Sequence, residues 1–279
     1  MVIRSAGTRR WLALLFTATL IQVFIAPAPS AKAASMEFTD SVRTSLNKTA
    51  EAAGGSTETR LKKLYNDLAA LDKQLAAQDT KTNSLRLSNE ARLIQTRKQI
   101  ANIDADKILK LDNQAKSARS KLQPLLDLHS SLNKQAAAVK SLKDKSLHKS
   151  LKQKADAMKP AIDLARLHIR NREAELKAAK SEKTRKTKEI RSVLSQIDTV
   201  KIKIKAERSS VSSKNKSIAA EWKNFKTALK NKDAGRASDT LNRLINLSNQ
   251  VLAHKQSIHK LETQISDIIA KAAAKINSK

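Results

Sequence analysis

A basic tract near the middle of the chain is the one segment whose residue types and spacing suggest a binding chemistry. Residues 177–188 (KAAKSEKTRKTK) hold six Lys and Arg against one acid. Such a density of positive charge along a helix can bind a polyanion through many weak contacts. It can also simply keep an elongated protein soluble. The candidate polyanion-binding residues are Lys177, Lys180, Lys183, Arg185, Lys186, Lys188 and Arg191.

Catalytic and metal-binding chemistry is not indicated. The chain has no Cys, and its five His residues are scattered. It lacks the Gly-rich phosphate loops, nucleophile elbows and His-Glu-x-x-His pairs of known catalytic sites. His254 and His259 are five residues apart, on different faces of a helix, so they cannot chelate one ion. We expect no enzymatic activity, no cofactor and no metal, and we interpret His254 as a polar residue that sets the register of a helix seam.

The first 33 residues have the three parts of a secretory signal peptide. A positive n-region precedes the apolar segment 11–26, and Ala31-Lys32-Ala33 matches a cleavage site. This segment of sixteen residues falls short of the ~20 that a membrane-spanning helix needs, which disfavours the alternative of an uncleaved anchor. We therefore expect cleavage after Ala33 and a secreted, cell-wall or periplasmic protein.

Positive charge is concentrated in the middle of the chain. After removal of the signal peptide, 51 Lys and Arg face 26 Asp and Glu, a net charge of +25. Residues 141–216 hold 22 basic against 9 acidic side chains, a net charge of +13. Gly and Pro are rare and aromatic residues make up only 3% of the chain, a composition typical of long helices.

A seven-residue repeat predicts how these helices pack. Nine of ten positions are apolar in the series Ile162, Ile169, Leu176, Lys183, Ile190, Ile197, Ile204, Val211, Ile218 and Phe225. Such a stripe is the seam of a coiled coil, and at about 1.5 Å per residue it would run roughly 95 Å. A second stripe runs from Leu244 to Ala272. Trp222, Phe225 and Leu229 share one helix face, which predicts a packed aromatic anchor.

The few glycine and proline residues that interrupt helices define the predicted domains. A signal peptide at 1–33 is followed by a short N-terminal helix or flexible segment at 34–56 and an elongated helical bundle at 57–279. Within the bundle we expect helices at about 57–157, kinked near Pro124, at 160–230 and at 238–276. Short connections make neighbouring helices antiparallel. The predicted fold is all-α, an elongated antiparallel coiled coil or helical bundle of three or four long helices.

The first long helix has an apparent change of register. Its leucine stripe runs from Leu61 to Leu75 and meets polar residues at Gln78 and Thr82. A shifted series then begins at Leu87 and continues through Ile94, Ala101, Ile108, Ala115 and Leu122. Such a shift is typical of a stutter in a coiled coil.

These features favour a non-enzymatic, envelope-associated coiled-coil protein. We expect it to bind anionic cell-wall or membrane-surface polymers through its basic helical surface, as a scaffold or adhesin. Nucleic acid is not expected as a partner, because the signal peptide exports the chain and residues 141–216 contain no Phe, Tyr or Trp on which bases could stack. Exposed stripes could also pair one chain with another.

A second interpretation is an extracytoplasmic chaperone or assembly factor. The basic, arm-like character of the chain and its signal peptide are similar to periplasmic holdase chaperones. That resemblance implies clamping of client chains between helical arms. Those chaperones also carry a small β core for trimerisation, and no β segment is evident in this sequence.

The charged seam positions generate a prediction about local stability. Arg172, Lys183, Lys186, Glu207 and Lys214 lie on or beside the stripe, within 172–190 and 205–216. The seam positions from Leu244 to Ile268 are apolar apart from His254. We expect fast amide hydrogen exchange in the first two segments and slow exchange in the third. Uniform protection over all three would contradict it.

Overall fold

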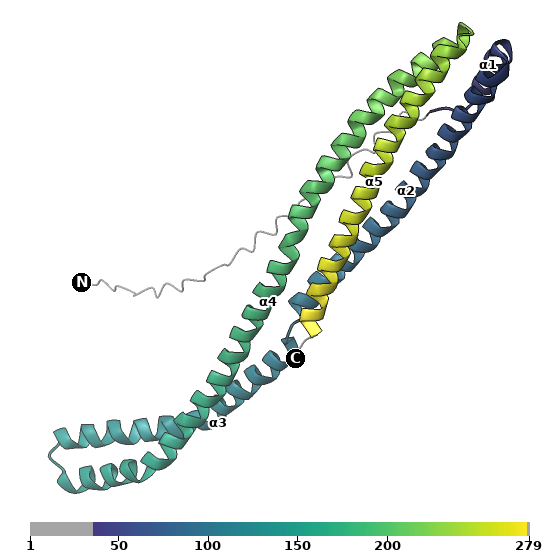
Figure 1. The fold of residues 1–279 in the computed structure, drawn as a ribbon. Coiled ribbons are helices and arrows are strands. Elements are labelled where there is room, and N and C mark those ends of the chain that lie inside the picture. The colour runs from purple at the N-terminus through teal and green to yellow at the C-terminus, as the bar shows by residue number, and fades with distance from the viewer. Residues whose placement is uncertain (1–35, 278–279) are drawn as a thin grey trace, which may run out of the picture.

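The computed structural model describes residues 36–277, which form five helices and no strand. The helices are α1 (Asp40–Ala53), α2 (Gly55–Ala101), α3 (Ala105–Ser141), α4 (Lys145–Lys230) and α5 (Ala234–Asn277) (Figure 1). The predicted all-α fold is confirmed. The predicted signal peptide at 1–33 lies outside the described residues.

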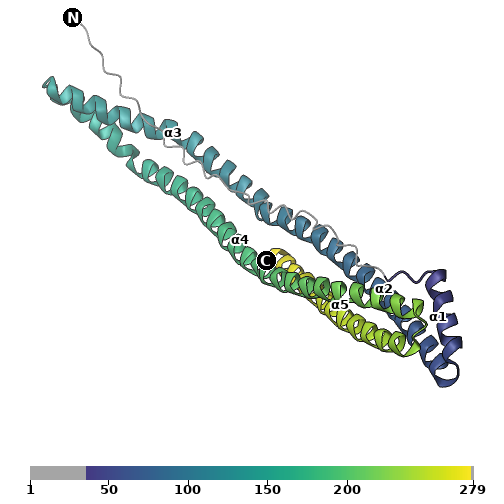
Figure 2. The ribbon, with the colours of Figure 1, turned by 90° about the horizontal axis from the view of Figure 1, so that it is seen from above.

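The longest helix, α4, is the spine of the molecule. With 86 residues it extends about 130 Å at about 1.5 Å per residue. Helix α5 packs against both α2 and α4, and α3 packs against the N-terminal part of α4 (Figures 1 and 2). The result is a bundle of α2, α5 and the C-terminal part of α4, with α1 at its end. A two-helix hairpin, made of α3, the turn 142–144 and residues 145–190 of α4, extends from it.

The seven-residue stripe of α4 is the seam for both parts. Its partner changes at Ile190, which is 1% exposed and packs in one cluster with Ile100, Ile103 and Ala272. We call these four residues the junction. Beyond it α5 covers the stripe, where Ile197 lies in a second apolar cluster with side chains of α5.

The end of the bundle near α1 has the largest core. Four rings from three segments lie in contact, with centroid distances of 5.3 Å for Phe38–Trp222 and Trp222–Phe225 and 6.3 Å for Tyr65–Phe225. Phe225 is fully buried, and Leu229 is 4% exposed. The predicted aromatic anchor is therefore confirmed.

The hairpin seam is built mainly from small side chains. Six of the seven buried residues between 105 and 180 are alanines: Ala115, Ala118, Ala136, Ala155, Ala165 and Ala179, with Ile162 as the seventh. Alanine lets two helices approach closely but removes little apolar surface from water. The hairpin therefore has a weaker core per residue than the bundle.

The prediction of one helix over 57–157 is wrong. The chain leaves helical geometry at 102–104, where Asp104 has φ of 50°, and again at 142–144, where Lys143 has φ of 59°. Asp tolerates the left-handed region without glycine, so the first break lacks the usual sequence signal. Pro124 lies inside α3, which continues across it as predicted.

The predicted helix boundary at Pro160 is also wrong. Helix α4 begins at Lys145, where the Asp144 carboxylate caps it by accepting the Leu147 amide at 3.0 Å, and it runs on through Pro160. Ile162 and Ala165, buried one turn later, hold the helix against α3 despite the missing amide donor.

The two prolines lie at the same level of the hairpin. His148 Nδ1 is 2.8 Å from the carbonyl oxygen of Ala136 across the antiparallel pair. Twelve residues further from the turn along each helix are Pro124 and Pro160. The hairpin bends between junction and turn (Figure 1), and a proline in each helix gives a physical reason for both to bend together.

The predicted register shift in the first long helix is wrong within α2. Leu87 and Ile94 are 52% and 56% exposed, whereas Asn89, only 3% exposed, stays on the original seam. The polar residue is tolerated because its Nδ2 donates to the carbonyl oxygen of Glu262 on α5 at 2.8 Å. In α3 the predicted series does hold, since Ala115 is buried.

Two shorter segments refine the boundaries. The predicted N-terminal segment 34–56 contains α1, which is capped by Thr39 and ends at Gly54, where φ is 62°. The connection between the predicted helices 160–230 and 238–276 is shorter than expected. The carboxylate of Asp233 accepts the Arg236 amide at 2.9 Å and so starts α5 at Ala234, four residues before the predicted start at 238.

The ring cluster predicts where truncation matters most. Phe225→Ala should lower the free energy of unfolding by about 3–5 kcal/mol, because it leaves a cavity among side chains of several helices. Ile202→Ala, at a position that is 70% exposed on the same helix, should change it by about 0.5 kcal/mol or less. Urea titration followed by circular dichroism measures both, and equal losses would contradict the assignment of the main core.

Candidate functional site

The seven predicted polyanion-binding residues all lie on α4 beside the junction. Five are exposed, and Lys183 and Lys186 are half-buried. The structure thus brings the predicted residues together on one helix. It also gives four of them partners within the protein, which divides the set into structural and available charges.

Lys183 and Lys186 hold the break between α2 and α3. The Lys183 ammonium donates to the carbonyl oxygen of Ala101, the last residue of α2, at 3.1 Å. Lys186 lies 3.8 Å from the Asp104 carboxylate in the break itself. A cation at the carbonyl end of a helix is favourable because it meets the negative end of the helix dipole. The main role of these two lysines is therefore to stabilise the break between α2 and α3.

Arg185 and Lys180 are also paired. Arg185 bonds to Glu182 and lies 2.6 Å from Glu189, and the hydrogen bond from Arg185 holds the pKa of the Glu182 carboxyl below its usual range. Lys180 lies 4.0 Å from Asp112 of α3. The three with neither an ion pair nor a hydrogen bond to the described residues are Lys177, Lys188 and Arg191.

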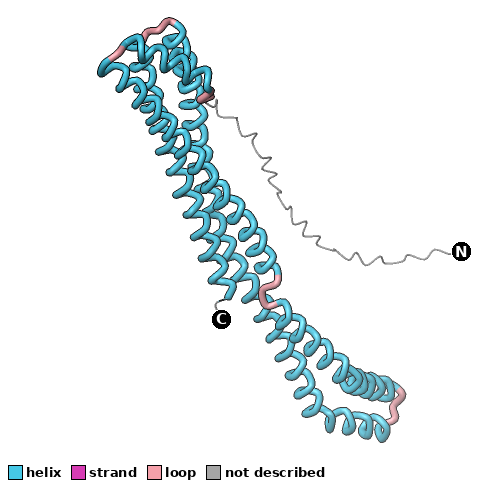
Figure 3. Tube along the Cα trace, turned by 90° about the vertical axis from the view of Figure 1, so that its right-hand side faces the viewer, coloured by secondary structure: helices cyan, strands magenta, loops and turns pink. Residues whose placement is uncertain are grey.

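A second group of cations lies at the end of the hairpin. We call it the basic tip, and it consists of Lys134, Lys140, Lys143, Lys145, Lys149, Lys152 and Lys154. All seven side chains are exposed, and none forms an ion pair with the described residues. Figure 3 shows the turn of the hairpin at the end of the molecule farthest from α1.

The nearest carboxylates do not neutralise the basic tip. Asp144, the only acid within residues 134–154, caps α4. Asp156 accepts from Lys159 at 2.8 Å, and this hydrogen bond holds the pKa of the Asp156 carboxyl below its usual value. Asp144 is thus engaged at the start of α4 and Asp156 chiefly with Lys159, so among the tip lysines only Lys152 interacts with the charge of Asp156.

Charge density alone could not distinguish the two groups. The tract at 177–188 is denser in sequence, but Glu182 and Glu189 stand three and four residues from Arg185, the spacing at which helical side chains pair. Around the basic tip only two acids lie within four residues of any lysine. Counting acids at helical spacing would have identified the tip.

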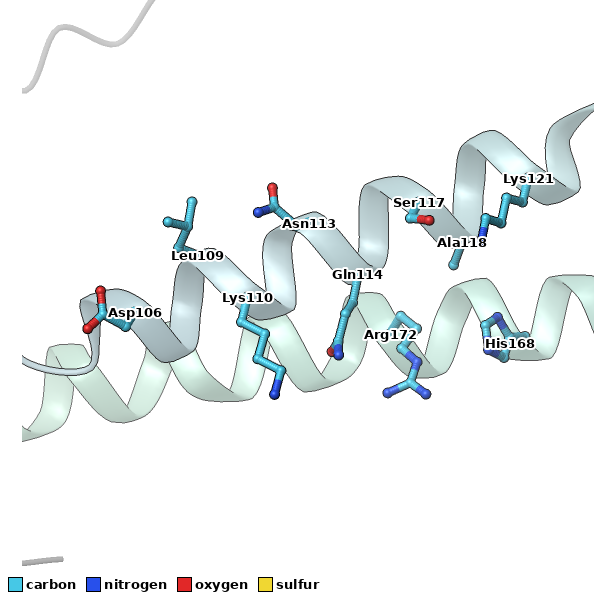
Figure 4. A pocket seen from close by; sticks show the side chains of 10 residues that line it. All are labelled: Asp106, Leu109, Lys110, Asn113, Gln114, Ser117, Ala118, Lys121, His168 and Arg172. Carbon is cyan, nitrogen blue, oxygen red and sulfur yellow. The ribbon is translucent and has the colours of Figure 1, made fainter.

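A shallow groove of about 630 Å³ runs along the hairpin beside the basic tract, lined by α3 between residues 106 and 121 and by His168 and Arg172 of α4. Its cations come from both helices, and Lys110 of α3 and Arg172 of α4 extend toward the same side (Figure 4). Arg172 also donates to Glu175 at 2.9 Å. The groove is open and has no converging catalytic groups, so it adds positive surface along the hairpin.

His254 occupies the seam position that the sequence predicts. Its Nδ1 lies 2.6 Å from the carboxylate of Glu207 on α4, and the Ser257 hydroxyl donates to the same carboxylate at 3.1 Å. The histidine is a hydrogen-bonded seam residue that ties α5 to α4. It takes no part in the basic surface.

Comparisons of the chain with protein-family models, with curated proteins and with solved structures find no match. Within residues 36–277, no three His, Cys, Asp or Glu side chains gather as a metal site would require. No helix in that range is long and apolar enough to span a bilayer. A helical fold does not by itself imply a function, so the charge and exposure of particular side chains are the features that can indicate one.

The two kinds of lysine in the tract should respond differently to substitution. Lys183→Gln with Lys186→Gln should lower the urea midpoint, by on the order of 1 kcal/mol or less, because the carbonyl end of α2 loses its cations. The matched pair Lys177→Gln with Lys188→Gln removes equal charge from positions without ion pairs and should leave the midpoint unchanged. A shift of equal size in both would show that only net charge matters.

Proposed function

We propose that this protein is a non-enzymatic, extracytoplasmic rod that binds anionic cell-wall or membrane-surface polymers through its hairpin, as a scaffold or adhesin. The observation that supports this most directly is the basic tip, seven exposed lysines that form no ion pair with the described residues. The predicted signal peptide supports the location.

The distribution of charge supports the hairpin as the binding element. Residues 105–190 hold 22 Lys and Arg against 10 Asp and Glu, a net charge of +12 on 86 residues. The other 156 described residues carry the same net charge of +12. The hairpin is therefore nearly twice as densely charged as the bundle, which favours contact with a polyanion there.

The shape of the molecule suits binding at many points. A polymer with regularly spaced anionic groups can contact the basic tip, the groove and the free residues of the tract in succession. Each exposed contact is weak, but linked contacts raise the overall affinity strongly. The bundle stands away from the tip (Figure 2), so it remains available as a spacer or for contacts with a second partner.

One observation supports the alternative of an extracytoplasmic holdase chaperone. Six of the nine exposed large hydrophobic side chains in the described chain lie on the hairpin: Leu109, Leu128, Leu142, Leu147, Leu164 and Leu167. Apolar side chains among lysines could hold an unfolded client. Suppression of the turbidity of an aggregating client would distinguish this alternative from simple polyanion binding.

Removing tip charge should weaken polyanion binding more than removing the same charge elsewhere. The tip variant is Lys143→Gln, Lys145→Gln, Lys149→Gln and Lys152→Gln. The control variant is Lys201→Gln, Lys203→Gln, Lys205→Gln and Lys216→Gln, four exposed lysines of α4 within the bundle. On immobilised polyphosphate, the parent and the control should elute at similar salt, and the tip variant should elute markedly earlier, because exposed charges are screened by salt.

Two outcomes would contradict the proposal. Retention of the parent that does not respond to salt would exclude an electrostatic surface. Equal weakening by the tip and control variants would show that total charge, not the hairpin, determines binding.

A further inference from the structure

The basic tip carries exposed leucines as well as lysines. Leu142 is 78% exposed, more than any other exposed large hydrophobic side chain in the described residues, and Leu147 is 47% exposed. Leu142 is the first residue of the turn that joins α3 to α4, and Leu147 lies in the first turn of α4. A soluble polyanion would use the lysines there and leave this apolar surface in water.

The fold explains why these leucines have no partner inside the protein. The turn has only three residues, and Lys143 in its left-handed conformation sends the chain directly back. The seam beneath it is closed by Ala136 and Ala155, at 3% and 0% exposure, and by the contact of His148 with Ala136. The hairpin is complete without Leu142 and Leu147, so their side chains remain outside it.

The surrounding charge defines the chemistry of the partner. Lys140, Lys143, Lys145 and Lys149 stand within a few residues of the two leucines in sequence, and all four are exposed. A matching surface is anionic on its outside and apolar just beneath. An anionic lipid bilayer has this arrangement, because long lysine side chains reach the headgroups while leucines enter the acyl boundary.

We propose that the tip of the hairpin docks on an anionic lipid bilayer, with Leu142 and Leu147 inserted at the headgroup level and the flanking lysines on the lipid phosphates. This inference rests on the proposed function and names its target among the anionic surfaces. Docking at the tip holds the bundle away from the membrane, since α4 connects the two ends.

Co-sedimentation with vesicles tests this inference. The parent should bind vesicles of equal parts phosphatidylglycerol and phosphatidylcholine and should bind phosphatidylcholine alone much more weakly. Leu142→Ser with Leu147→Ser should reduce binding to the anionic vesicles about tenfold or more, because two apolar anchors are lost. The control Leu87→Ser with Ile94→Ser removes two half-exposed apolar side chains from α2 and should bind as the parent does.

Fluorescence reports insertion directly. Leu142→Trp should give a blue shift of emission on anionic vesicles, whereas Ile202→Trp, which is exposed on the bundle, should give none. The parent supplies the background of the native Trp222, which is 6% exposed in the core. A tip tryptophan that binds without a blue shift would overturn insertion.

The remaining outcomes separate this inference from the proposed function. If the parent binds polyphosphate but not anionic vesicles, the lipid inference is wrong and polyanion binding stands. If the parent binds neither, both are wrong. If the leucine variant binds vesicles as the parent does, docking is electrostatic only and insertion is wrong. If the leucine variant also loses its binding to polyphosphate, the leucines maintain the arrangement of the lysines and do not insert into lipid. The inference is then again wrong.

Discussion

The apolar stripe of α4 is the constraint on which the rest of the structure depends. A helix with one continuous stripe must cover it along its whole length, because each exposed seam residue would leave apolar surface in water. Helix α5 has 44 residues and can cover only about half of the 86 in α4. The chain therefore supplies α3 for the remainder. The junction at Ile190 is the level at which one partner replaces the other.

Because the seam has different partners in its two parts, the bundle and the hairpin differ in their cores and in the side chains that they expose. In the bundle, three long helices surround large side chains, and four rings gather at one end. In the hairpin only two helices meet, and alanines bring them close enough to close the seam. Two helices cannot surround a wide core, so six large apolar side chains remain outside among the lysines. The weaker core of the hairpin and its exposed apolar side chains have the same cause, because the hairpin has only two helices where the bundle has three.

The repeat was enough to predict the all-α fold, the antiparallel pairing and the aromatic anchor, because periodicity reports directly which face of a helix is buried. The breaks were harder. The turn at 102–104 contains neither Gly nor Pro, and the helix continues through Pro160 because packing at Ile162 compensates for the lost hydrogen bond. The register of α2 depends on an acceptor that α5 offers to Asn89, and no local pattern records it.

A basic helical surface could be predicted from the sequence, but the particular lysines that are available on it could not. The sequence identified residues 141–216 as the most basic part of the chain, and residues 145–190 of that segment belong to the hairpin. Which lysines are available depends on carboxylates from other helices and on the carbonyl end of α2, as Lys183 shows. Such partners come together only in the folded chain. The tip lysines are less dense in sequence, but they stand where acids are few and already engaged.

Because the junction lies at one end of the hairpin, a small rotation there moves the opposite end over a large distance. Residues 145–190 make an arm of roughly 70 Å at about 1.5 Å per residue. A rotation of about 10° at its base would move the far end by about 12 Å, more than the width of a helix. The contacts of Lys183 and Lys186 at that base thus set how large an area the far end can sweep. Lys183 and Lys186 would in this way limit the area that the tip lysines can reach.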